Sequence, residues 1–309
     1  MDIGMIGLGR MGANMAARLL GGGHRVVGYD VGGEASAEAA ALGVEPVATL
    51  TQLLDALPTP RVVWLMVPAK TVDDTLHVLT PLLEAGDVVV DGGNSHYRDS
   101  QRRAVDLQAQ GVGFIDCGTS GGIWGLAEGY CLMLGGPAES VRRLEPLLDT
   151  LATGTRDGWA HVGPVGAGHY VKMIHNGIEY GMMQAYAEGF ALLQRKQEMA
   201  LDLPQIAQLW RHGSVVRSWL LDLSASALQR NPQLAGVAPY VDDSGEGRWT
   251  VAEAIDLDVA APVITLSLLE RLRSREGDSF VDKLLATMRN EFGGHALRLD
   301  ADPPPPVSS

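Results

Sequence analysis

The stretch that decides the fold is Ile3-Gly4-Met5-Ile6-Gly7-Leu8-Gly9-Arg10-Met11-Gly12, near the start of the chain. Its first four residues form an apolar, strand-like run that leads directly into the pattern G-x-G-x-x-G, and a helical pattern follows over Met11–Leu20. In this context Gly7 permits a tight turn, Gly9 lets the backbone approach a pyrophosphate, and Gly12 lets helix and strand pack closely. The helix N-terminus offers free N–H groups to phosphates. We therefore expect the following residues at a dinucleotide cofactor: Gly7, Gly9, Arg10, Met11 and Gly12.

Asp30 stands close after the next strand-like run, Arg25–Gly28, about 20 residues beyond the glycines. A carboxylate at this position accepts hydrogen bonds from the ribose hydroxyls of NAD and repels the 2′-phosphate of NADP. The residues that follow, Val31-Gly32-Gly33, include no arginine to hold such a phosphate. The sequence therefore predicts NAD as the cofactor, with NADP as the less favoured choice.

The first half of the chain alternates strand-like runs with helical patterns, an order that indicates a parallel sheet covered on both faces. The further runs are Val62–Met66, Val88–Val90, Gly113–Asp116 and Tyr130–Leu134. After about Gly163 only helical patterns are visible. We expect an α/β Rossmann-type dinucleotide-binding domain followed by an all-α helical domain. The predicted boundaries are 1–164 for the first domain, 165–300 for the second, and 301–309 for a proline-rich tail.

Composition narrows the class of protein. The chain has 309 residues, of which 46% are hydrophobic and 20% are charged, as is usual for a soluble protein of two domains. It has no apolar run long enough for a membrane span and no signal-peptide pattern, so a cytoplasmic location is expected. The net charge of −13 argues against binding to nucleic acid. Cys117 and Cys131 lie in apolar runs and are expected to be buried free thiols.

The segment Lys172–Tyr180 carries the clearest chemical pattern. Lys172, His175, Asn176 and Glu179 stand at i, i+3, i+4 and i+7, which places them on one face of a helix. Their neighbours Met173, Ile174, Met182 and Met183 are apolar, so this face is expected to line a pocket. A partly desolvated lysine has a lowered pKa and can act as a base toward a hydroxyl group.

A second pattern, Cys117-Gly118-Thr119-Ser120-Gly121-Gly122, follows the fifth strand-like run. A hydroxyl group and exposed backbone N–H groups at the C-terminal end of a strand suit a carboxylate. The histidines show no metal-ligand spacing, so no metal site is expected.

Several motifs, in the same order, resemble those of the 6-phosphogluconate dehydrogenase family, and the resemblance covers nearly the whole chain. They are the glycine loop, Asp91-Gly92-Gly93-Asn94-Ser95 with Tyr97, Thr119-Ser120-Gly121-Gly122, the Lys172–Tyr180 segment, Gly245-Glu246-Gly247-Arg248-Trp249-Thr250, and Arg289-Asn290-Glu291-Phe292-Gly293-Gly294-His295. The resemblance implies oxidative decarboxylation of 6-phosphogluconate to ribulose 5-phosphate, with Lys172 as general base and later acid and Glu179 as the acid that protonates the enediol.

The same resemblance implies roles for further residues. Those implied to bind the substrate hydroxyls and carboxylate are Asn94, Ser120, Gly121, Gly122, His175 and Asn176. Those implied to reach the phosphate are Tyr180, Arg248, Thr250 and Arg271. Asn94 and Val67 are also placed at the cofactor. Arg289 and His295 are implied to enter the site of a neighbouring subunit, which predicts a homodimer or tetramer with shared active sites.

Two departures from the family pattern leave alternatives open. The helical half is shorter than in the long members, so Arg289 and His295 could act in cis or in trans. The position after Asp30 lacks the arginine of NADP-using members, which supports NAD. Separately, Arg248 replaces the lysine of the motif, which keeps the charge and changes its geometry. A different β-hydroxyacid dehydrogenase, such as one for 3-hydroxyisobutyrate, would share the glycine loop and Lys172 but would not need Glu179-Tyr180. An imine reductase would lack Lys172, and a non-catalytic NAD-binding sensor would not need its catalytic face.

Overall fold

The computed structural model describes residues 1–153 and 156–293. The chain divides into two compact units. The first unit contains Met1–Met183 and Ser244–Ile264, and the second contains Gln184–Asp243 and the residues from Thr265 onward. Each unit is described separately below.

The first unit is built on an eight-stranded sheet with the order β3-β2-β1-β4-β5-β6-β7-β8. The strands are β1 (Asp2–Ile6), β2 (Arg25–Tyr29), β3 (Glu45–Pro46), β4 (Val62–Leu65), β5 (Val88–Asp91), β6 (Gly113–Ser120), β7 (Cys131–Gly135) and β8 (Trp159–Gly163). All neighbouring strands are parallel except β6 and β7. Parallel neighbours bring the C-terminal ends of β1, β4, β5 and β6 to one edge, where ligands bind in such sheets.

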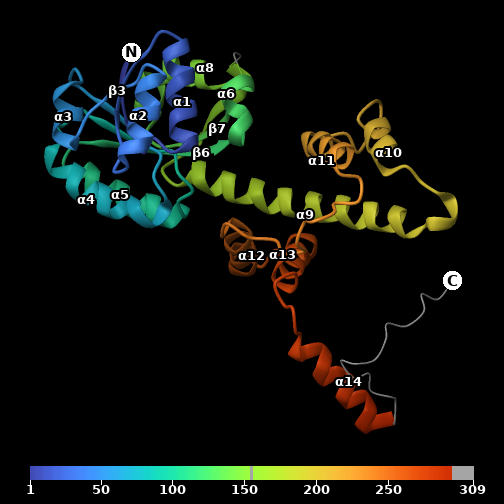
Figure 1. Ribbon diagram of the computed structural model, residues 1–309. Helices are drawn as coiled ribbons and strands as arrows, with labels where there is room; N and C mark the ends of the chain where they lie inside the picture. The colour runs from blue at the N-terminus through green and yellow to red at the C-terminus, as the bar shows by residue number, and fades with distance from the viewer. Residues whose placement is uncertain (154–155, 294–309) are drawn as a thin grey trace. The chain divides into compact units, whose positions relative to one another are not determined.

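Helices cover both faces of this sheet (Figure 1). Those of the first unit are α1 (Arg10–Gly21), α2 (Gly33–Ala41), α3 (Leu50–Asp55), α4 (Val72–Leu79), α5 (Tyr97–Gln108), α6 (Gly125–Glu128), α7 (Ala138–Arg143), α8 (Glu145–Leu151) and α12 (Glu246–Asp256), with the start of α9 (Ala167–Arg195) and of α13 (Pro262–Arg273). Short 3₁₀ turns join several of them.

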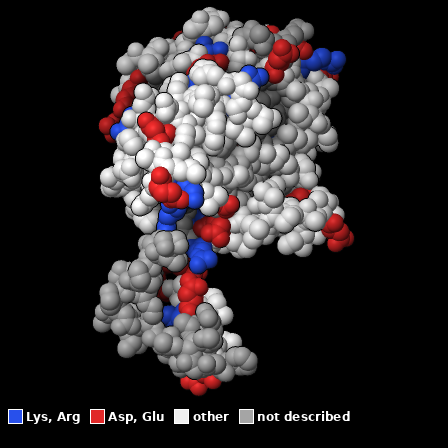
Figure 2. Space-filling model, turned by 90° about the vertical axis from the view of Figure 1, so that its right-hand side faces the viewer, with Lys and Arg blue, Asp and Glu red and all other residues white. Residues whose placement is uncertain are grey.

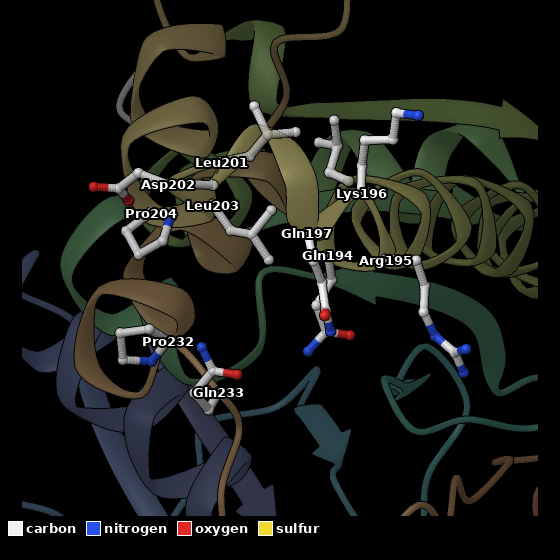
Figure 3. A pocket seen from close by; sticks show the side chains of 12 residues that line it. Gln194, Arg195, Lys196, Gln197, Leu201, Asp202, Leu203, Pro204, Pro232 and Gln233 are labelled. Atoms are coloured by element: carbon white, nitrogen blue, oxygen red, sulfur yellow. The ribbon is translucent and has the colours of Figure 1, made fainter. Parts of the chain in front are cut away.

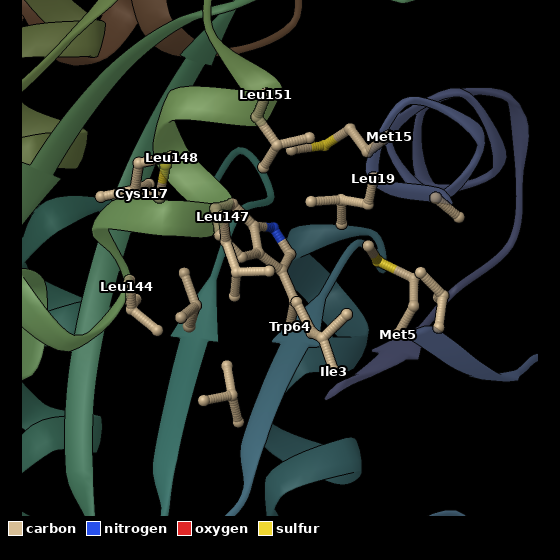
Figure 4. Packing of buried hydrophobic residues seen from close by; sticks show 14 of the residues in the cluster. Ile3, Met5, Met15, Leu19, Trp64, Cys117, Leu144, Leu147, Leu148 and Leu151 are labelled. Carbon is tan, nitrogen blue, oxygen red and sulfur yellow. The ribbon is translucent and has the colours of Figure 1, made fainter. Parts of the chain in front are cut away.

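Two apolar clusters hold the layers together. On one face Met15 and Leu19 of α1 pack with Leu147 of α8 around Trp64 of β4 (Figure 4). On the other face the side chains of α3, α4 and α5 form the second cluster. Val88 and Val90 belong to the first cluster whereas Val89 belongs to the second, because successive strand residues point to opposite faces. This two-sided burial explains why the central strands read as continuous apolar runs.

The second unit is helical in its described part. It contains the later residues of α9 and α13, together with α10 (Leu203–Trp210), α11 (Trp219–Arg230) and α14 (Phe280–Gly293). Its small core joins Leu203 and Ala207 of α10 to Ala225 and Leu228 of α11. Among the described helices, none combines the length and apolar character that a membrane-spanning segment requires.

The structure confirms the predicted fold class, a Rossmann-type sheet followed by helices. Prediction missed β3, α3 and β8, and it did not anticipate that β7 runs antiparallel to β6. Edge strands β3 and β8 bury few side chains, so they lack the apolar run that identified the central strands.

The start of α9 is anchored to the sheet by a buried carboxylate. Oδ1 of Asp116 in β6 accepts a hydrogen bond from the Gly166 backbone N–H at 2.6 Å, and Oδ2 accepts one from the His169 N–H at 2.8 Å. Burial raises the pKa of Asp116, and His169 and these backbone donors oppose the rise. The carboxylate thereby pairs N–H groups of the first turn of the helix that would otherwise lack acceptors.

We predict that Gly168→Ala destabilises the protein, because an added Cβ would clash with the backbone oxygens of Asp116 and Met133 and lie 2.9 Å from the Gly135 nitrogen. The expected loss is about 1–3 kcal/mol of unfolding free energy, measured by urea denaturation. Gly189→Ala on the same helix is the control. No atom lies within 4 Å of a Cβ there, so a gain of about 0.5–1 kcal/mol is expected. Equal stability of the two variants would contradict the close packing of α9 on β6.

Candidate active site

The glycine loop after β1 has the geometry of a phosphate cradle. Gly7 has φ of 93°, and a Cβ on it would lie 2.6 Å from the Met66 oxygen, so only glycine fits. A Cβ on Gly12 would clash with the Gly7 oxygen. Gly9 caps α1 without a side-chain hydrogen bond, and no atom lies within 4 Å of where a Cβ on Gly9 would stand. The space beside Gly9 at the N-terminus of α1 is therefore open, as the approach of a pyrophosphate requires.

Asp30 is fixed beside this loop. Its Oδ2 accepts a hydrogen bond from the Leu8 N–H at 2.6 Å, and its Oδ1 accepts one from the Gly32 N–H at 2.7 Å. Each carboxylate oxygen retains a lone pair for a ribose hydroxyl. Val31 is almost fully exposed and offers no cation to a 2′-phosphate. Val67 also lies at the loop, since its Cγ1 is 3.1 Å from where a Cβ on Gly7 would stand.

Lys172 lies where α9 passes over the end of β6. A Cβ on Gly118 of β6 would clash with the Lys172 Cβ and lie 2.6 Å from the Gly168 oxygen, so this glycine permits the close approach. The lysine side chain is half-buried. Burial lowers the pKa of Lys172, and the Glu179 and Glu246 carboxylates and the Cys131 thiol oppose this shift. The result is an amine that loses its proton more readily than an ordinary lysine.

The other polar residues of this face are also half-buried. His175 Nδ1 lies 3.0 Å from Asn176 Oδ1 and 3.9 Å from Glu179 Oε2. The apolar surroundings differ from the prediction, because Met182 and Met183 are exposed in the isolated chain. Met173 is buried as its apolar character predicts, and the close approach of β6 at Gly118 covers Lys172.

Helix α12 also packs against α9. A Cβ on Gly247 would lie 2.5 Å from the Tyr180 ring, and one on Gly177 would lie 2.7 Å from Thr250 Cγ2. The Thr250 hydroxyl is buried and directs its hydrogen to backbone oxygens, with Met173 O at 2.9 Å. A phosphate at Thr250 would have to compete with these carbonyl groups.

The loop after β5 is held by a buried polar network that the sequence reasoning missed. Asp91 Oδ2 accepts hydrogen bonds from the Ser95 hydroxyl at 2.7 Å and from Arg103 Nη1 at 3.2 Å. Between these fixed points Asn94 is exposed, and its Nδ2 donates a hydrogen bond to Oε1 of Glu246. The D-G-G-N-S motif could have indicated this network, because its first and last residues, Asp91 and Ser95, lie on either side of Asn94.

Ser120 ends β6, where it pairs with Cys131 of β7, and the glycine-rich loop follows it. Gly121 and Gly122 have φ of 138° and 52°, conformations that disfavour other residues. Cys117 is buried and free as predicted, but Cys131 is exposed, so that prediction was wrong. The error arises because Cys131 opens its strand at the edge where the sheet meets the site.

The predicted arginines are distributed over both units. Arg248 belongs to α12, whereas Arg271 belongs to the second unit and donates from Nη1 to the Asp242 oxygen at 2.9 Å. Arg289 lies in α14, and its side chain is not described; His295 lies outside the described residues. No group of three or more metal-ligating side chains occurs among the residues described.

A separate pocket of about 770 Å³ lies within the second unit (Figure 3). It is lined by the end of α9, the segment 196–204, and residues 232–233. None of the predicted site residues lines it, so it is not part of the candidate active site.

Comparison with known proteins agrees with this architecture. The family profile described as the NAD binding domain of 6-phosphogluconate dehydrogenase matches residues 2–163. The profile for the C-terminal domain of 6-phosphogluconate dehydrogenase matches residues 168–291. The fold and site thus define a Rossmann-fold dehydrogenase with a helical second part, and the chain belongs to the 6-phosphogluconate dehydrogenase family.

Individual relatives support the same assignment. The NAD⁺-dependent, decarboxylating 6-phosphogluconate dehydrogenase of Haloferax volcanii is 47% identical over 96% of this chain and 98% of its own length. The solved 6-phosphogluconate dehydrogenase of Plasmodium falciparum, studied with NADP⁺, has 27% identity and a TM-score of 0.82, covering 98% of this chain and 67% of that one. A 3-hydroxyisobutyrate dehydrogenase of Mycobacterium tuberculosis shares the fold at 22% identity, with a TM-score of 0.71 over 93% of this chain and 99% of that one.

We predict that Lys172 reacts with an acylating reagent at lower pH than an ordinary lysine, because only the neutral amine is nucleophilic. The labelling rate, followed by mass spectrometry of the Lys172 peptide, should reach half its maximum below pH 10.5. The exposed Lys70 serves as an internal reference for the reagent. A midpoint at or above 10.5 would contradict the desolvated environment of the amine.

Proposed function

We propose that this protein catalyses NAD-dependent oxidative decarboxylation of 6-phospho-D-gluconate to D-ribulose 5-phosphate and CO₂. The observation that carries the proposal is the half-buried Lys172, which shares a helix face with Glu179 above the end of β6. Its lowered pKa suits a base that must be neutral before it accepts a proton.

Each proton in this reaction has a group on α9 to carry it. A bound NAD would be held by the glycine loop and Asp30 and would supply the hydride acceptor for C3 of the substrate. Lys172 Nζ removes the proton of the C3 hydroxyl and leaves a 3-keto acid, from which the C1–C2 bond breaks to release CO₂. The resulting ammonium group returns its proton to the enolate oxygen. Glu179 then donates a proton to C2 of the enediol, so the two groups divide the acid and base work.

Substrate contacts follow from the same assignment. We assign the hydroxyls and carboxylate to Asn94, Ser120, Gly121, Gly122, His175 and Asn176. We assign the phosphate to Tyr180, Arg248, Thr250 and Arg271, with Arg289 and His295 supplied in cis or in trans. A local group of arginines would offset the net charge of −13, which repels a phosphorylated acid from the surface as a whole.

The preference for NAD over NADP rests on Asp30. The cofactor residues in this proposal are Gly7, Gly9, Arg10, Met11, Gly12, Asp30, Val67 and Asn94. Because two backbone N–H groups hold the Asp30 carboxylate, it cannot swing away from a 2′-phosphate without losing both hydrogen bonds. The backbone of the loop therefore holds the Asp30 carboxylate where it repels a 2′-phosphate.

We also propose that residues 1–164 serve the cofactor, that 165–300 serve the substrate and self-association, and that the protein acts as a homodimer or tetramer. Several large apolar side chains of the second unit are exposed: Leu209, Val215, Trp219 and Leu223. Figure 2 shows a face on which charged residues are sparse. Exposed apolar area of this kind is typical of an interface between subunits. The proline-rich tail, 301–309, lies outside the described residues, and the cytoplasmic location stays a prediction.

The direct test is reduction of NAD by 6-phosphogluconate, measured by absorbance of the reduced nicotinamide, in wild type and Lys172→Ala. We predict turnover in the wild type and a loss of about 100- to 10,000-fold in kcat for the variant, with NAD binding retained. Retained binding, measured by fluorescence quenching, controls for folding. Wild-type turnover of 3-hydroxyisobutyrate but not of 6-phosphogluconate would sink the proposal, as would full activity of Lys172→Ala.

Cofactor choice has its own test. Asp30→Ser combined with Val31→Arg should raise the NADP/NAD ratio of kcat/KM by about tenfold or more, because a repelling charge is removed and an attracting one is added. Val31→Arg alone is the matched control, since it leaves the carboxylate in place. An unchanged ratio in the double variant would show that Asp30 does not set the preference.

A further inference from the structure

Glu246 is a buried acid for which the chemistry above has no role. It is the first residue of α12, between the two glycines of Gly245-Glu246-Gly247, and it is 2% exposed. Burying a carboxylate without hydrogen-bond partners costs free energy, so the partners of Glu246 are informative. An acid at a helix N-terminus often interacts with the backbone of its own helix. Here both oxygens are engaged by side chains instead.

One of these contacts leads directly into the candidate site. Glu246 Oε1 accepts a hydrogen bond from Asn94 Nδ2, and Oε2 accepts one from the Ser244 hydroxyl at 2.5 Å. An ionised carboxylate only accepts hydrogen bonds, so the asparagine must turn its NH₂ group toward Glu246. Asn94 Oδ1 is thereby directed away from Glu246, where it can accept a hydrogen bond from a hydroxyl or carboxamide of a bound ligand.

The backbone on both sides fixes this contact in place. The loop that carries Asn94 is held by the Asp91–Ser95–Arg103 network, and α12 is held on α9 by the contact of Gly247 with Tyr180. The two segments are 152 residues apart in the chain. Glu246 therefore joins two rigid parts of the first unit at the point where cofactor and substrate would meet.

We propose that Glu246 is a positioning residue of this active site, whose carboxylate orients the Asn94 amide toward the bound ligand and supplies negative charge to Lys172. The inference rests on the proposed function for its kinetic part. Three groups act to raise the pKa of Lys172 against the effect of burial: Glu179 on α9, Glu246 on α12 and Cys131 on β7. Removing the Glu246 charge must then lower the pKa of Lys172 further.

The first arm of the test needs no substrate. In Glu246→Gln, the pH midpoint for acylation of Lys172 should fall below that of the wild type. Glutamine is nearly isosteric, and the Ser244 hydroxyl can accept a hydrogen bond from its amide, so this variant should fold. Glu253→Gln is the matched control. Glu253 is a buried acid on the same helix that binds Tyr97 and Arg98 and is not among the groups that shift Lys172.

The second arm is a double-mutant cycle in 6-phosphogluconate turnover with NAD. Glu246→Ala should lower kcat/KM by about 10- to 100-fold, the usual cost of losing a charge-assisted hydrogen bond. Glu246→Gln can still accept a hydrogen bond from Asn94, so its kcat/KM should fall less. If Glu246 acts through Asn94, adding Glu246→Ala to Asn94→Ala should cost little more than Asn94→Ala alone.

The outcomes distinguish a failure of the Glu246 proposal from a failure of the proposed function. An unshifted labelling midpoint in Glu246→Gln, or losses that multiply in the double variant, overturns the role of Glu246. Absence of wild-type turnover overturns the proposed function instead, and the labelling arm then decides the role of Glu246 by itself. Where Glu246→Ala does not fold, the contrast of Glu246→Gln with Glu253→Gln keeps the first arm decisive.

Discussion

The seating of α9 on β6 is the contact on which the rest of the site depends. The Asp116 carboxylate binds the first turn of the helix, and Gly118 and Gly168 remove the side chains that would separate helix from strand. A helix is stiff over a few turns, so fixing its first turn also fixes residues one and two turns later. Lys172 is thereby placed at the edge of the sheet where the parallel strands end, which is the edge that carries the glycine loop.

Buried charge is used around this edge to fix backbone and amide groups rather than to add stability. Asp30, Asp91 and Asp116 each receive hydrogen bonds from a backbone N–H, and Glu246 receives one from an amide. Such pairs contribute little net stability once the cost of desolvation is counted. Their value is geometric, because each carboxylate holds a loop or helix end in one conformation.

Much of this arrangement was predictable from the sequence, and the limits have physical causes. Local patterns imply a single arrangement in space, and three of them were available here. They are the glycine loop, Asp30, and the helical spacing of Lys172, His175, Asn176 and Glu179. The short edge strands β3 and β8 were missed because they bury too little to leave an apolar run. The contact between Asn94 and Glu246 joins residues far apart in the chain, so no local sequence pattern could predict it. Cys131 was misjudged because neighbouring apolar residues do not reveal which end of a strand meets a site.

The proposed function couples oxidation at C3 to loss of the carboxyl carbon through two groups on α9, Lys172 and Glu179. It is tested most directly with 6-phosphogluconate labelled with ¹³C at C1, by measuring reduced nicotinamide and labelled CO₂ together in one reaction with NAD. We predict equal amounts of the two products throughout the time course, because Lys172 and Glu179 are proposed to carry both halves of the reaction at one site. Reduced nicotinamide without labelled CO₂ would contradict the account and would indicate a simple hydroxyacid dehydrogenase.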